Sequence, residues 1–501
     1  MQLRELLAQI PTLGTQGSLE REIAGLSYDS RRVMPGMVFV ALPGLNADGH
    51  EFIMNAIERG AAAVICEQNG FVSPRTTKIK VADAREALAK AAVSFYQHPS
   101  SKLKVVGVTG TNGKTTVAFM IKEILQAASI RAGLIGTIRY EIGDRILSAR
   151  RTTPESLELQ EMMAQMVRAE CRACVMEVSS HALEQKRVNG VEFDVAIFTN
   201  LTQDHLDYHG TMEAYFQAKQ KLFTGLHQSA KSGTAIINID DAYGERLAHE
   251  VHPEIMLTYG LDEAAKIRAS QIQLGRDSTR MLVETPAQSF PCCIPLIGRH
   301  NIYNALAAIG AGLALNVDVA AIQTGLSGMP KVPGRLESIA MGQPFGVLID
   351  YAHTDDALRN VLTTVREITA ERLILVFGCG GNRDVGKRPR MGAIAARLAD
   401  LTIITSDNPR KEIAATIALQ IEEGYRSIRA DGSRIEEDRS RAIDDAVRAA
   451  KPGDTVLIAG KGHETYQEFE NTVVPFDDRV HARESLEALG YRENNQTPET
   501  N

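Results

Sequence analysis

The 501-residue chain has no surplus of positive charge, no long apolar run and few cysteines. Its formal net charge of −7 argues against a nucleic-acid-binding protein, because such proteins usually carry a basic patch. No apolar run approaches the roughly 20 residues that cross a bilayer, and the N-terminus lacks a signal-peptide core. These absences predict a cytoplasmic protein with no nucleic-acid partner and no membrane insertion.

Cysteine is scarce, with six residues in the whole chain. Cys171 and Cys174 have the C-x-x-C spacing of redox motifs and zinc sites. No second pair lies at zinc-ribbon distance, and the apolar run that follows looks like a buried strand. We therefore expect both to be reduced structural thiols.

A glycine-rich loop at residues 110–116 lies between an apolar strand pattern and an amphipathic helix pattern. Glycines let backbone amides close around phosphate oxygens, and the start of the helix adds positive potential. Lys114 can reach the outer phosphates, and Thr115 can place its hydroxyl on Mg²⁺. Val108 replaces the first glycine of a strict Walker A motif, so the flanking strand and helix support the prediction. The predicted phosphate-binding residues are Gly110, Thr111, Asn112, Gly113, Lys114, Thr115 and Thr116.

The chain is too long for one hydrophobic core, and its length suggests about three domains. We expect a small mixed α/β N-terminal domain (1–100), a central P-loop parallel-sheet domain resembling an ATPase (101–331) and a C-terminal Rossmann-like domain (332–501). Predicted strands are 36–42, 103–108, 173–178, 195–199, 345–350, 373–377, 401–405 and 455–459, and predicted helices include 356–368 and 439–450.

Polar side chains accompany two strand patterns of the central segment. Glu177 lies in an apolar run, where a carboxylate is costly unless it is paired or bound to a metal. Mg²⁺ beside the phosphate loop would meet that need, and a salt bridge to a buried arginine is the alternative. The next strand pattern is followed by Asp204, His205, Asp207 and His209. These form a candidate cation or proton-transfer site, although a polar loop with a helix cap explains Asp207 and His209 equally well.

Three polar loops follow strand patterns of the C-terminal segment, at 378–383, 406–410 and 460–464. Because binding residues of parallel α/β sheets gather at the carboxyl ends of the strands, we expect these loops to meet in one crevice.

These motifs, in this order along nearly the whole chain, resemble the Mur ligase family. The matching segments are 29–31, 35–36, 48–50, 110–116, 151–154, 177–181, 200–209, 298–301, 333–335, 350–353 and 460–464. So many motifs in one order are far more specific than any single one. Within the family, the match is closest to members that add the third residue of the peptidoglycan stem peptide.

The resemblance implies ATP-driven amide synthesis. The γ-phosphate would pass to the D-glutamate carboxylate of UDP-MurNAc-L-Ala-D-Glu, and an incoming amine would attack the acyl phosphate and expel inorganic phosphate. Phosphorylation makes the carboxylate oxygen a good leaving group, so catalysis consists mainly of positioning and charge neutralisation. The implied partners are small-molecule substrates, the implied cofactors are ATP and Mg²⁺, and we expect a monomer.

The resemblance also implies roles for single residues. The implied catalytic residues are Lys114, Lys219 and His205. The implied metal ligands are Thr115, Glu177, His205 and Lys219. The implied contacts to adenine and to the ribose of ATP are Asn301 and Asp350. The implied UDP-sugar contacts, which would otherwise be ordinary helix or loop polarity, are Ser30, Thr152, Thr153, Ser179, Gln185 and Arg187.

Lys219 matches a carbamylated lysine of the family. A carbamate turns the cationic side chain into an anion that can support the metal site. The sequence alone would make Lys219 an ordinary surface lysine on a helix.

The third residue would be chosen in the C-terminal domain. The run 407–410 looks like the family variant that accepts meso-diaminopimelate rather than L-lysine. Arg383 and Arg410 can bind a distal carboxylate, and Glu464 can accept from the distal ammonium. The implied amino-acid contacts are Arg383, Asp407, Asn408, Pro409, Arg410, Gly460 and Glu464. L-lysine or another amino acid as acceptor, and a non-catalytic ATP-binding paralogue, are the alternatives.

One position departs from the family pattern. Asp355 stands where the family usually has proline. We expect Asp355 to cap a helix, which leaves the structure intact. The change leaves open a paralogue with altered kinetics or substrate.

Overall fold

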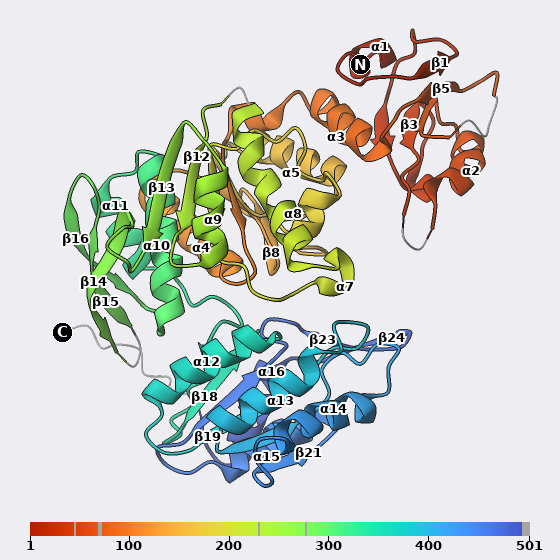
Figure 1. Ribbon diagram of the computed structural model, residues 1–501. Coiled ribbons are helices and arrows are strands. Elements are labelled where there is room, and N and C mark those ends of the chain that lie inside the picture. The colour runs from red at the N-terminus through yellow and green to blue at the C-terminus, as the bar shows by residue number, and fades with distance from the viewer. Residues whose placement is uncertain (45–46, 69–72, 229–230, 276–277, 493–501) are drawn as a thin grey trace.

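The computed structural model describes all residues except 45–46, 69–72, 229–230, 276–277 and 493–501. The chain forms three α/β regions in sequence order, each with its own sheet (Figure 1). No helix of the described ranges is long and apolar enough to cross a membrane. The mixed α/β fold with parallel sheets agrees with the expected fold class.

The N-terminal region is built on a five-stranded sheet in the order β1-β5-β4-β3-β2. Four strands are parallel, and β1 pairs antiparallel with β5 at the edge. The strands are β1 (Gly14–Gln16), β2 (Gly25–Ser27), β3 (Met37–Val40), β4 (Ala63–Cys66) and β5 (Thr77–Lys80). The helices are α1 (Leu3–Leu6), α2 (Ile53–Glu58) and α3 (Ala84–Phe95), with short 3-10 turns at η1 (Ser30–Arg32), η2 (Gly49–Phe52) and η3 (Pro99–Lys102).

The central region contains an eleven-stranded sheet. Its parallel core places β6 between β10 and β11, with Val106 opposite both Val175 and Val195. Antiparallel strands extend both edges. The strands are β6 (Lys104–Thr109), β7 (Ala132–Ile135), β8 (Arg139–Ile142), β9 (Arg145–Ser148), β10 (Ala173–Glu177), β11 (Val195–Phe198), β12 (Thr234–Asn238), β13 (Ile255–Gly260), β14 (Ile267–Leu274), β15 (Thr279–Glu284) and β16 (Ser289–Ile294).

Helices cover both faces of the central parallel strands. Val106 and Val108 pack into one apolar core with α4, α10 and α11, and Val105 packs into the opposite core with α5 and α8. Burial on both faces explains why these strands appear in the sequence as continuous apolar runs. The helices are α4 (Lys114–Ala127), α5 (Ser156–Arg168), α6 (Ser180–Glu184), α7 (Leu206–His209), α8 (Met212–Thr224), α9 (Ala242–Glu250), α10 (Arg299–Ala314) and α11 (Val319–Ser327), with a 3-10 turn at η4 (Gly225–Gln228).

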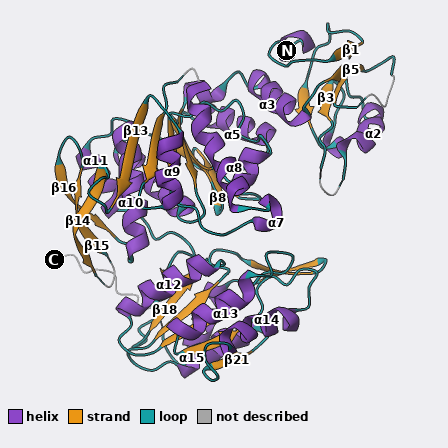
Figure 2. Ribbon diagram, viewed as in Figure 1, coloured by secondary structure: helices purple, strands orange, loops and turns teal. Residues whose placement is uncertain are grey.

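The C-terminal region has a six-stranded sheet with helices on both faces (Figure 2). Its order is β17-β18-β22-β19-β20-β21, so the last parallel strand in the chain lies between the first two. The strands are β17 (Glu337–Ser338), β18 (Gly346–Asp350), β19 (Leu373–Phe377), β20 (Leu401–Ile404), β21 (Ser433–Ile435) and β22 (Thr455–Ala459), with a separate hairpin of β23 (Tyr466–Phe469) and β24 (Thr472–Pro475). The helices are α12 (Asp355–Ile368), α13 (Lys387–Leu398), α14 (Ala414–Arg426), α15 (Arg439–Ala449) and α16 (Asp478–Ala488).

The predicted strands and helices of the three regions are confirmed to within three residues at each end. One local expectation is wrong. Thr354, and not Asp355, caps α12: its hydroxyl accepts from the amide of Ala357 at 3.2 Å. Asp355 is the first helical residue, where proline is also favourable because the amide there has no intrahelical partner. Thr354 therefore caps the helix, while the Oδ1 of Asp355 accepts from the amide of Asp356 at 3.1 Å.

Cys171 and Cys174 are free thiols and both are buried. Cys174 lies within β10, and burial raises the pKa of its thiol to about 12. Both thiols are therefore part of the hydrophobic core around this strand. This confirms the expectation of reduced structural thiols.

Candidate active site

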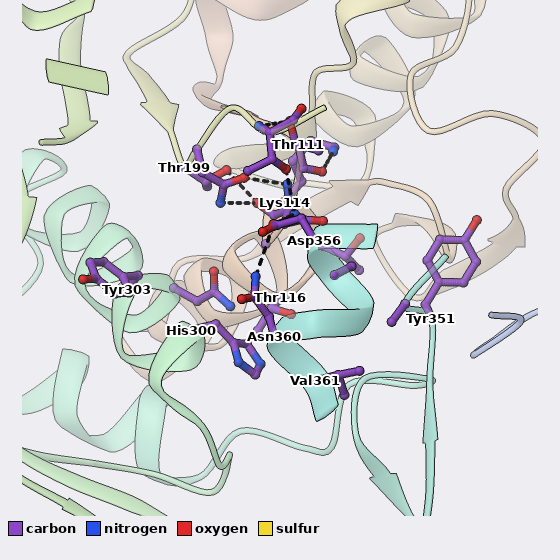
Figure 3. Close-up of a pocket in the computed structure, with 18 of the residues that line it drawn as sticks. Thr111, Lys114, Thr116, Thr199, His300, Tyr303, Tyr351, Asp356, Asn360 and Val361 are labelled. Carbon is purple, nitrogen blue, oxygen red and sulfur yellow. Dashed lines mark hydrogen bonds between the residues drawn. The ribbon is translucent and has the colours of Figure 1, made fainter. Parts of the chain in front are cut away.

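A cavity of about 700 Å³ lies between the central and C-terminal regions (Figure 3). It is lined by the phosphate loop, the ends of β10 and β11, the start of α10, and the segment from β18 into α12. In Figure 3, Thr111 and Lys114 face Asp356 and Asn360 of α12. The carboxyl ends of parallel strands and the N-terminus of α4 therefore converge on one space, an arrangement suited to an anionic ligand.

The phosphate loop needs its glycines. Gly113 has φ +88° and precedes α4, and a Cβ there would lie 2.4 Å from the Oδ1 of Asn304. A Cβ on Gly110 would lie 1.9 Å from the Oγ1 of Thr199. Lys114 donates to the carbonyl oxygens of Gly110 and Thr111 at 2.9 and 2.8 Å, and burial lowers its pKa. The loop thus brings a lysine ammonium and the start of a helix to the same point.

Glu177, at the end of β10, is buried among hydroxyl groups. Both carboxylate oxygens accept from the Thr115 hydroxyl at 3.0 Å, and Thr137 donates through its amide at 2.8 Å and its hydroxyl at 3.0 Å. Within the described ranges Glu177 forms no ion pair with an arginine, so the salt-bridge alternative is wrong.

Thr115 and Glu177 supply hard oxygen donors, which is the ligand type that Mg²⁺ prefers. No three His, Cys, Asp or Glu side chains of the described segments converge as a metal-binding group. That is compatible with Mg²⁺, because it often takes only one or two carboxylates and completes its shell with substrate phosphates and water. The donors present therefore fit a phosphate-bound Mg²⁺ better than an all-protein metal centre.

His205 adopts the left-handed conformation, with φ +54°, where the chain enters α7. Its ring lies 4.8 Å from the ring of His181, and its Nε2 is 3.4 Å from Asp204. Burial lowers the pKa of His205 to about 3. Asp204 and His205 line the cavity, whereas Asp207 is exposed in the first turn of α7 and His209 contacts Ser180 at 2.9 Å. Of the four polar residues, Asp204 and His205 therefore line the cavity, and Asp207 and His209 do not.

Lys219 is buried, with 1% of its surface exposed, so the surface-lysine alternative is wrong. Its Nζ donates to the carbonyl of Gly110 at 2.8 Å and lies 4.6 Å from the centre of the Tyr215 ring. Burial lowers the pKa of Lys219 well below its usual value, and the charge of Lys114 adds to that effect. Tyr215, Phe216, Leu222 and Phe223 surround Lys219 at helical spacing, a signal in the sequence that could have indicated burial.

Asn301 and Asp350 line the same cavity from opposite regions. The Asn301 amide donates to the carbonyl of Ile297 at 2.8 Å. Asp350 accepts from the amides of Leu336 and Ala352 at 2.8 Å, and burial raises its pKa. Their contacts to adenine and ribose stay predictions.

Two further connections across the cavity were given no role at the sequence level. Arg335 donates to the Thr115 hydroxyl at 3.4 Å, and its guanidinium lies 4.9 Å from the Tyr351 ring. The Asn112 amide donates to Asp356 of α12 at 3.0 Å. Only the tertiary structure brings these residues together, because each pair is more than 200 positions apart in the chain.

Five of the six predicted UDP-sugar residues lie in one hydrogen-bonded group. The Thr153 hydroxyl accepts from the amide of Ser179 at 3.0 Å. Arg187 donates to the carbonyl of Thr153 at 3.0 Å and to the Gln185 oxygen at 2.6 Å. The Thr152 hydroxyl lies 3.0 Å from that of Thr137, which joins this group to Glu177.

Ser30 lies apart from this group. It is buried in η1 of the N-terminal region, and no hydrogen bond of the described chain connects it to the other five residues. The nearby Tyr28 hydroxyl donates to Glu158 of α5 at 2.8 Å, a contact between the N-terminal and central regions.

The three C-terminal loops meet as predicted. Asn408 donates to the Glu464 carboxylate at 2.9 Å, and the fully buried Lys461 donates to both residues at 3.1 Å. Arg410 has φ +52°, donates to Glu468 at 2.8 Å and donates to the carbonyl of Gly381 at 2.9 Å. Burial raises the pKa of Glu464.

The remaining acceptor-loop residues differ in exposure. Asp407 is buried, and its Oδ2 would lie 2.6 Å from a Cβ on Gly460. A Cβ on Gly381 would lie closer still to the carbonyl oxygen of Pro409. Arg383 is exposed and contacts only the neighbouring carbonyl of Asn382, at 3.3 Å, among the described residues. Lys461 and Glu468 were missed at the sequence level.

A buried ion pair forms hydrogen bonds to the backbone where two of these loops begin. Arg439 and Asp478 are fully buried and form hydrogen bonds of 2.7 and 2.8 Å. The same guanidinium donates to the carbonyls of Ser406 and Ala459, at 3.3 and 3.0 Å, where two of the polar loops begin.

Comparison with known families agrees with this architecture and site. The Mur ligase family catalytic domain matches residues 22–96, the Mur ligase middle domain matches 108–312, and the Mur ligase glutamate ligase domain matches 334–462. The chain therefore belongs to the Mur ligase family.

Within that family, the chain is similar to enzymes named UDP-N-acetylmuramoyl-L-alanyl-D-glutamate–2,6-diaminopimelate ligase. The one from Geobacter metallireducens is 46% identical over 496 residues, covering 96% of this chain and 97% of that protein. The one from Gloeobacter violaceus is 46% identical over 488 residues, covering 97% and 98%. A solved structure of a ligase with this name is 32% identical, with a TM-score of 0.69, and covers 98% of this chain and 99% of that chain.

Proposed function

We propose that this chain is an ATP-dependent ligase that joins meso-diaminopimelate to the D-glutamate carboxylate of UDP-MurNAc-L-Ala-D-Glu in peptidoglycan biosynthesis. The observation that carries the proposal is the single cavity in which the phosphate loop and Glu177 face the C-terminal region. The names of the relatives support the choice of substrates. We assign the UDP-sugar to residues 1–100 together with the Thr153–Arg187 group, ATP to 101–331, and the amino acid to 332–501.

Phosphoryl transfer is assigned to the phosphate-loop end of the cavity. Lys114 and the N-terminus of α4 would neutralise the outer phosphates, while Asn301 and Asp350 would hold the nucleoside. Mg²⁺ held here would supply positive charge that offsets the charge of the phosphates. Thr115 and Glu177 are the oxygen donors suited to hold it, and His205 would serve a second cation site.

The reaction has two steps. The D-glutamate carboxylate attacks the γ-phosphorus, so a C–O–P bond forms and ADP leaves. The amine nitrogen then attacks the acyl carbon, the C–N bond forms, inorganic phosphate leaves, and the amine loses a proton. The protein residues need only align the reactants and balance charge, which is the usual basis of catalysis in phosphoryl transfer.

We propose that Lys219 carries a carbamate. Its amine is enclosed without a carboxylate partner among the described residues, so the environment favours the neutral amine that can attack CO₂. The N–C bond forms, a proton is released, and the side chain becomes an anion. That anion would stand beside the phosphate loop, where it can support the cation sites.

Amino-acid choice is assigned to the acceptor loops, the segments 378–383, 406–410 and 460–464. Arg410 and Arg383 would bind the distal carboxylate of meso-diaminopimelate, and Glu464 with Asn408 would accept and orient its distal ammonium. Lysine lacks the distal carboxylate and would therefore forgo the contacts that Arg383 and Arg410 would make to it. We further propose that the enzyme acts as a cytoplasmic monomer on small-molecule substrates.

A competition assay tests this function. Purified protein receives ATP, Mg²⁺, UDP-MurNAc-L-Ala-D-Glu and equal amounts of meso-diaminopimelate and L-lysine, with phosphate release followed and products identified by mass spectrometry. The expected product is the diaminopimelate tripeptide. A lysine product would overturn the acceptor assignment and keep the ligase. Bound but unconsumed ATP would overturn the ligase in favour of a non-catalytic paralogue.

A further inference from the structure

Asp355, the first residue of α12, has a charged partner on α13. Its Oδ2 lies 2.9 Å from the Nε of Arg390 on α13. The Asp355 side chain is largely buried, with 17% of its surface exposed, against 40% for Arg390. Thr354 caps α12, and the Oδ1 of Asp355 accepts from the amide of Asp356 at 3.1 Å, so its Oδ2 remains to contact Arg390.

Arg390 reaches the central region with the other side of its guanidinium. With the Gln203 amide turned so that its oxygen faces Arg390, Nη1 and Nη2 donate to that oxygen at 3.2 and 3.0 Å. The Oδ2 of Asp384 lies 3.4 Å from the Nη2 of the same guanidinium, which is a longer distance. Gln203 immediately precedes Asp204 and His205, which line the cavity. The chain of contacts from Asp355 through Arg390 therefore ends in the loop that carries a proposed cation ligand.

A second contact lies one residue further along α12. Asp356 accepts from the Asn112 amide of the phosphate loop at 3.0 Å, and Asn112 also donates to the Thr202 hydroxyl at 3.4 Å. The first turn of α12 is thus connected to the central region on two sides. Asn112 and Asp356 both line the cavity assigned to ATP.

We propose that Asp355 is a positioning residue that orients Arg390 toward Gln203 and so holds the first turn of α12 against the nucleotide half of the cavity. The opposite charges of Asp355 and Arg390 attract across 2.9 Å, although the Arg390 Nε makes no hydrogen bond in the described structure, and this attraction keeps the two terminal nitrogens toward Gln203. The inference rests on the proposed function only in that ATP occupies this cavity.

The contact has a specific consequence for ligand binding. ATP would touch both the phosphate loop and the α12 side, so its affinity depends on how often the two regions are held together. The proposed UDP-sugar group centres on Thr153 and Arg187 of the central region, and among the described residues none of its members forms a hydrogen bond with Arg390. Loss of Asp355 should therefore weaken the binding of ATP and leave the binding of the UDP-sugar substrate unchanged.

Four variants test the proposal. Asp355→Pro restores the family residue and keeps a favourable helix start, Asp355→Glu keeps the charge, Arg390→Met keeps the aliphatic stem, and the double variant combines the first and third. The dissociation constant of a non-hydrolysable ATP analogue, the KM for each substrate and the melting temperature are measured for each. The expected result is an about three- to tenfold weaker nucleotide affinity in Asp355→Pro.

Three accompanying results are expected: recovery in Asp355→Glu, an unchanged KM for the UDP-sugar, and a double variant no weaker than Arg390→Met alone. An unchanged nucleotide affinity in Asp355→Pro would overturn the proposal, as would additive losses in the double variant. Equal weakening of nucleotide and UDP-sugar binding, or a lowered melting temperature that Asp355→Glu does not restore, would indicate a general folding role and overturn it too. Binding of the ATP analogue does not depend on amide synthesis. The dissociation constants can therefore be interpreted even if the ligase assay gives no product.

Discussion

Lys219 and Lys461 are both buried, but their surroundings differ. Lys461 is fully buried and donates to Glu464 and Asn408 at 3.1 Å, so its charge has a carboxylate beside it. Lys219 is 1% exposed, donates to the carbonyl of Gly110 and lies over the Tyr215 ring. Among the described residues it forms no ion pair with a carboxylate.

The difference shows how one residue type takes two roles in the two halves of the site. An ammonium taken out of water without a charged partner is unfavourable, and the group responds by favouring its neutral form. A paired ammonium stays a fixed donor, although its burial adds little net stability. Lys219 is therefore suited to chemistry on its nitrogen, and Lys461 is suited to holding the acceptor loops in place.

Among the proposed variants, Lys219→Met should reduce the catalytic rate the most. Without the proposed carbamate the cation sites lose an anion, and we expect phosphate release to fall by about 10³-fold, the range seen when a preorganised electrostatic group is removed. Nucleotide affinity should change little, and the melting temperature should not fall, because no buried ion pair is broken. Coupled phosphate assay, calorimetry and thermal melting measure these.

The intact mass of the wild type provides the companion check. In bicarbonate buffer, the native protein should gain the mass of one CO₂ that Lys219→Met does not gain. Wild-type turnover in the variant, or equal mass gain in both proteins, would contradict the carbamate assignment.

Lys461→Met should affect the fold where Lys219→Met does not. It leaves the Glu464 carboxylate buried without its cation, and breaking a buried pair costs about 3–5 kcal/mol. Urea unfolding of the two variants side by side makes the comparison direct. If both lysine variants lose the same stability, the distinction between the two buried lysines is wrong.

Arg410→Ala tests the acceptor half of the site without breaking a fully buried pair. We expect kcat/KM for meso-diaminopimelate to fall by about 10²-fold, because a carboxylate partner would lose a guanidinium fork. ATP binding should survive, since Arg410 lies on the loop that contacts Gly381 and Glu468. Steady-state kinetics with varied amino acid measure the effect, and unchanged kinetics would refute the assignment of Arg410.

Glu158→Gln extends the comparison to a buried carboxylate. Its expected effect, a change in the pH dependence of the free energy of unfolding, is the smallest of these predictions. Burial raises the pKa of Glu158, Glu155 adds to the rise, and the Tyr28 hydrogen bond and Arg32 oppose it. The folded protein therefore keeps this proton at a pH where the unfolded chain has lost it, so the wild type loses stability as pH rises through the folded pKa.

The stability of Glu158→Gln relative to wild type should accordingly rise from acidic to neutral pH, because the variant has no carboxyl group to titrate at this position. Urea unfolding at several pH values measures the difference. A difference that stays constant with pH would contradict the raised pKa.

Much of the architecture could be predicted from local patterns. The phosphate loop was recognisable because its glycines, lysine and flanking strand and helix all lie within a short segment. The strands of both parallel sheets were recognisable because burial on both faces requires uninterrupted apolar runs. The acceptor loops followed from their positions after such strands, and Asn408, Lys461 and Glu464 do meet there.

Other features depended on partners that no local pattern reveals. The sequence favoured Mg²⁺ binding by Glu177 and left an arginine salt bridge as the alternative, whereas Thr115 and Thr137 surround the carboxylate. Asp355 looked like a helix cap, but Thr354 takes that place and Asp355 pairs with Arg390. In each case the residue type indicated that a polar partner was needed, but the sequence did not reveal which residue that partner is.

The family resemblance, the α/β class and the positions of the binding loops could be inferred from the amino-acid sequence, because they follow from segments that are contiguous in the chain. The burial of Lys219 beside Gly110, 109 positions away, and the contacts of Arg390 with Asp355 and Gln203 became visible in the folded chain alone. Burial and pairing set the charge state and orientation of a side chain. Both depend on residues that only folding brings close.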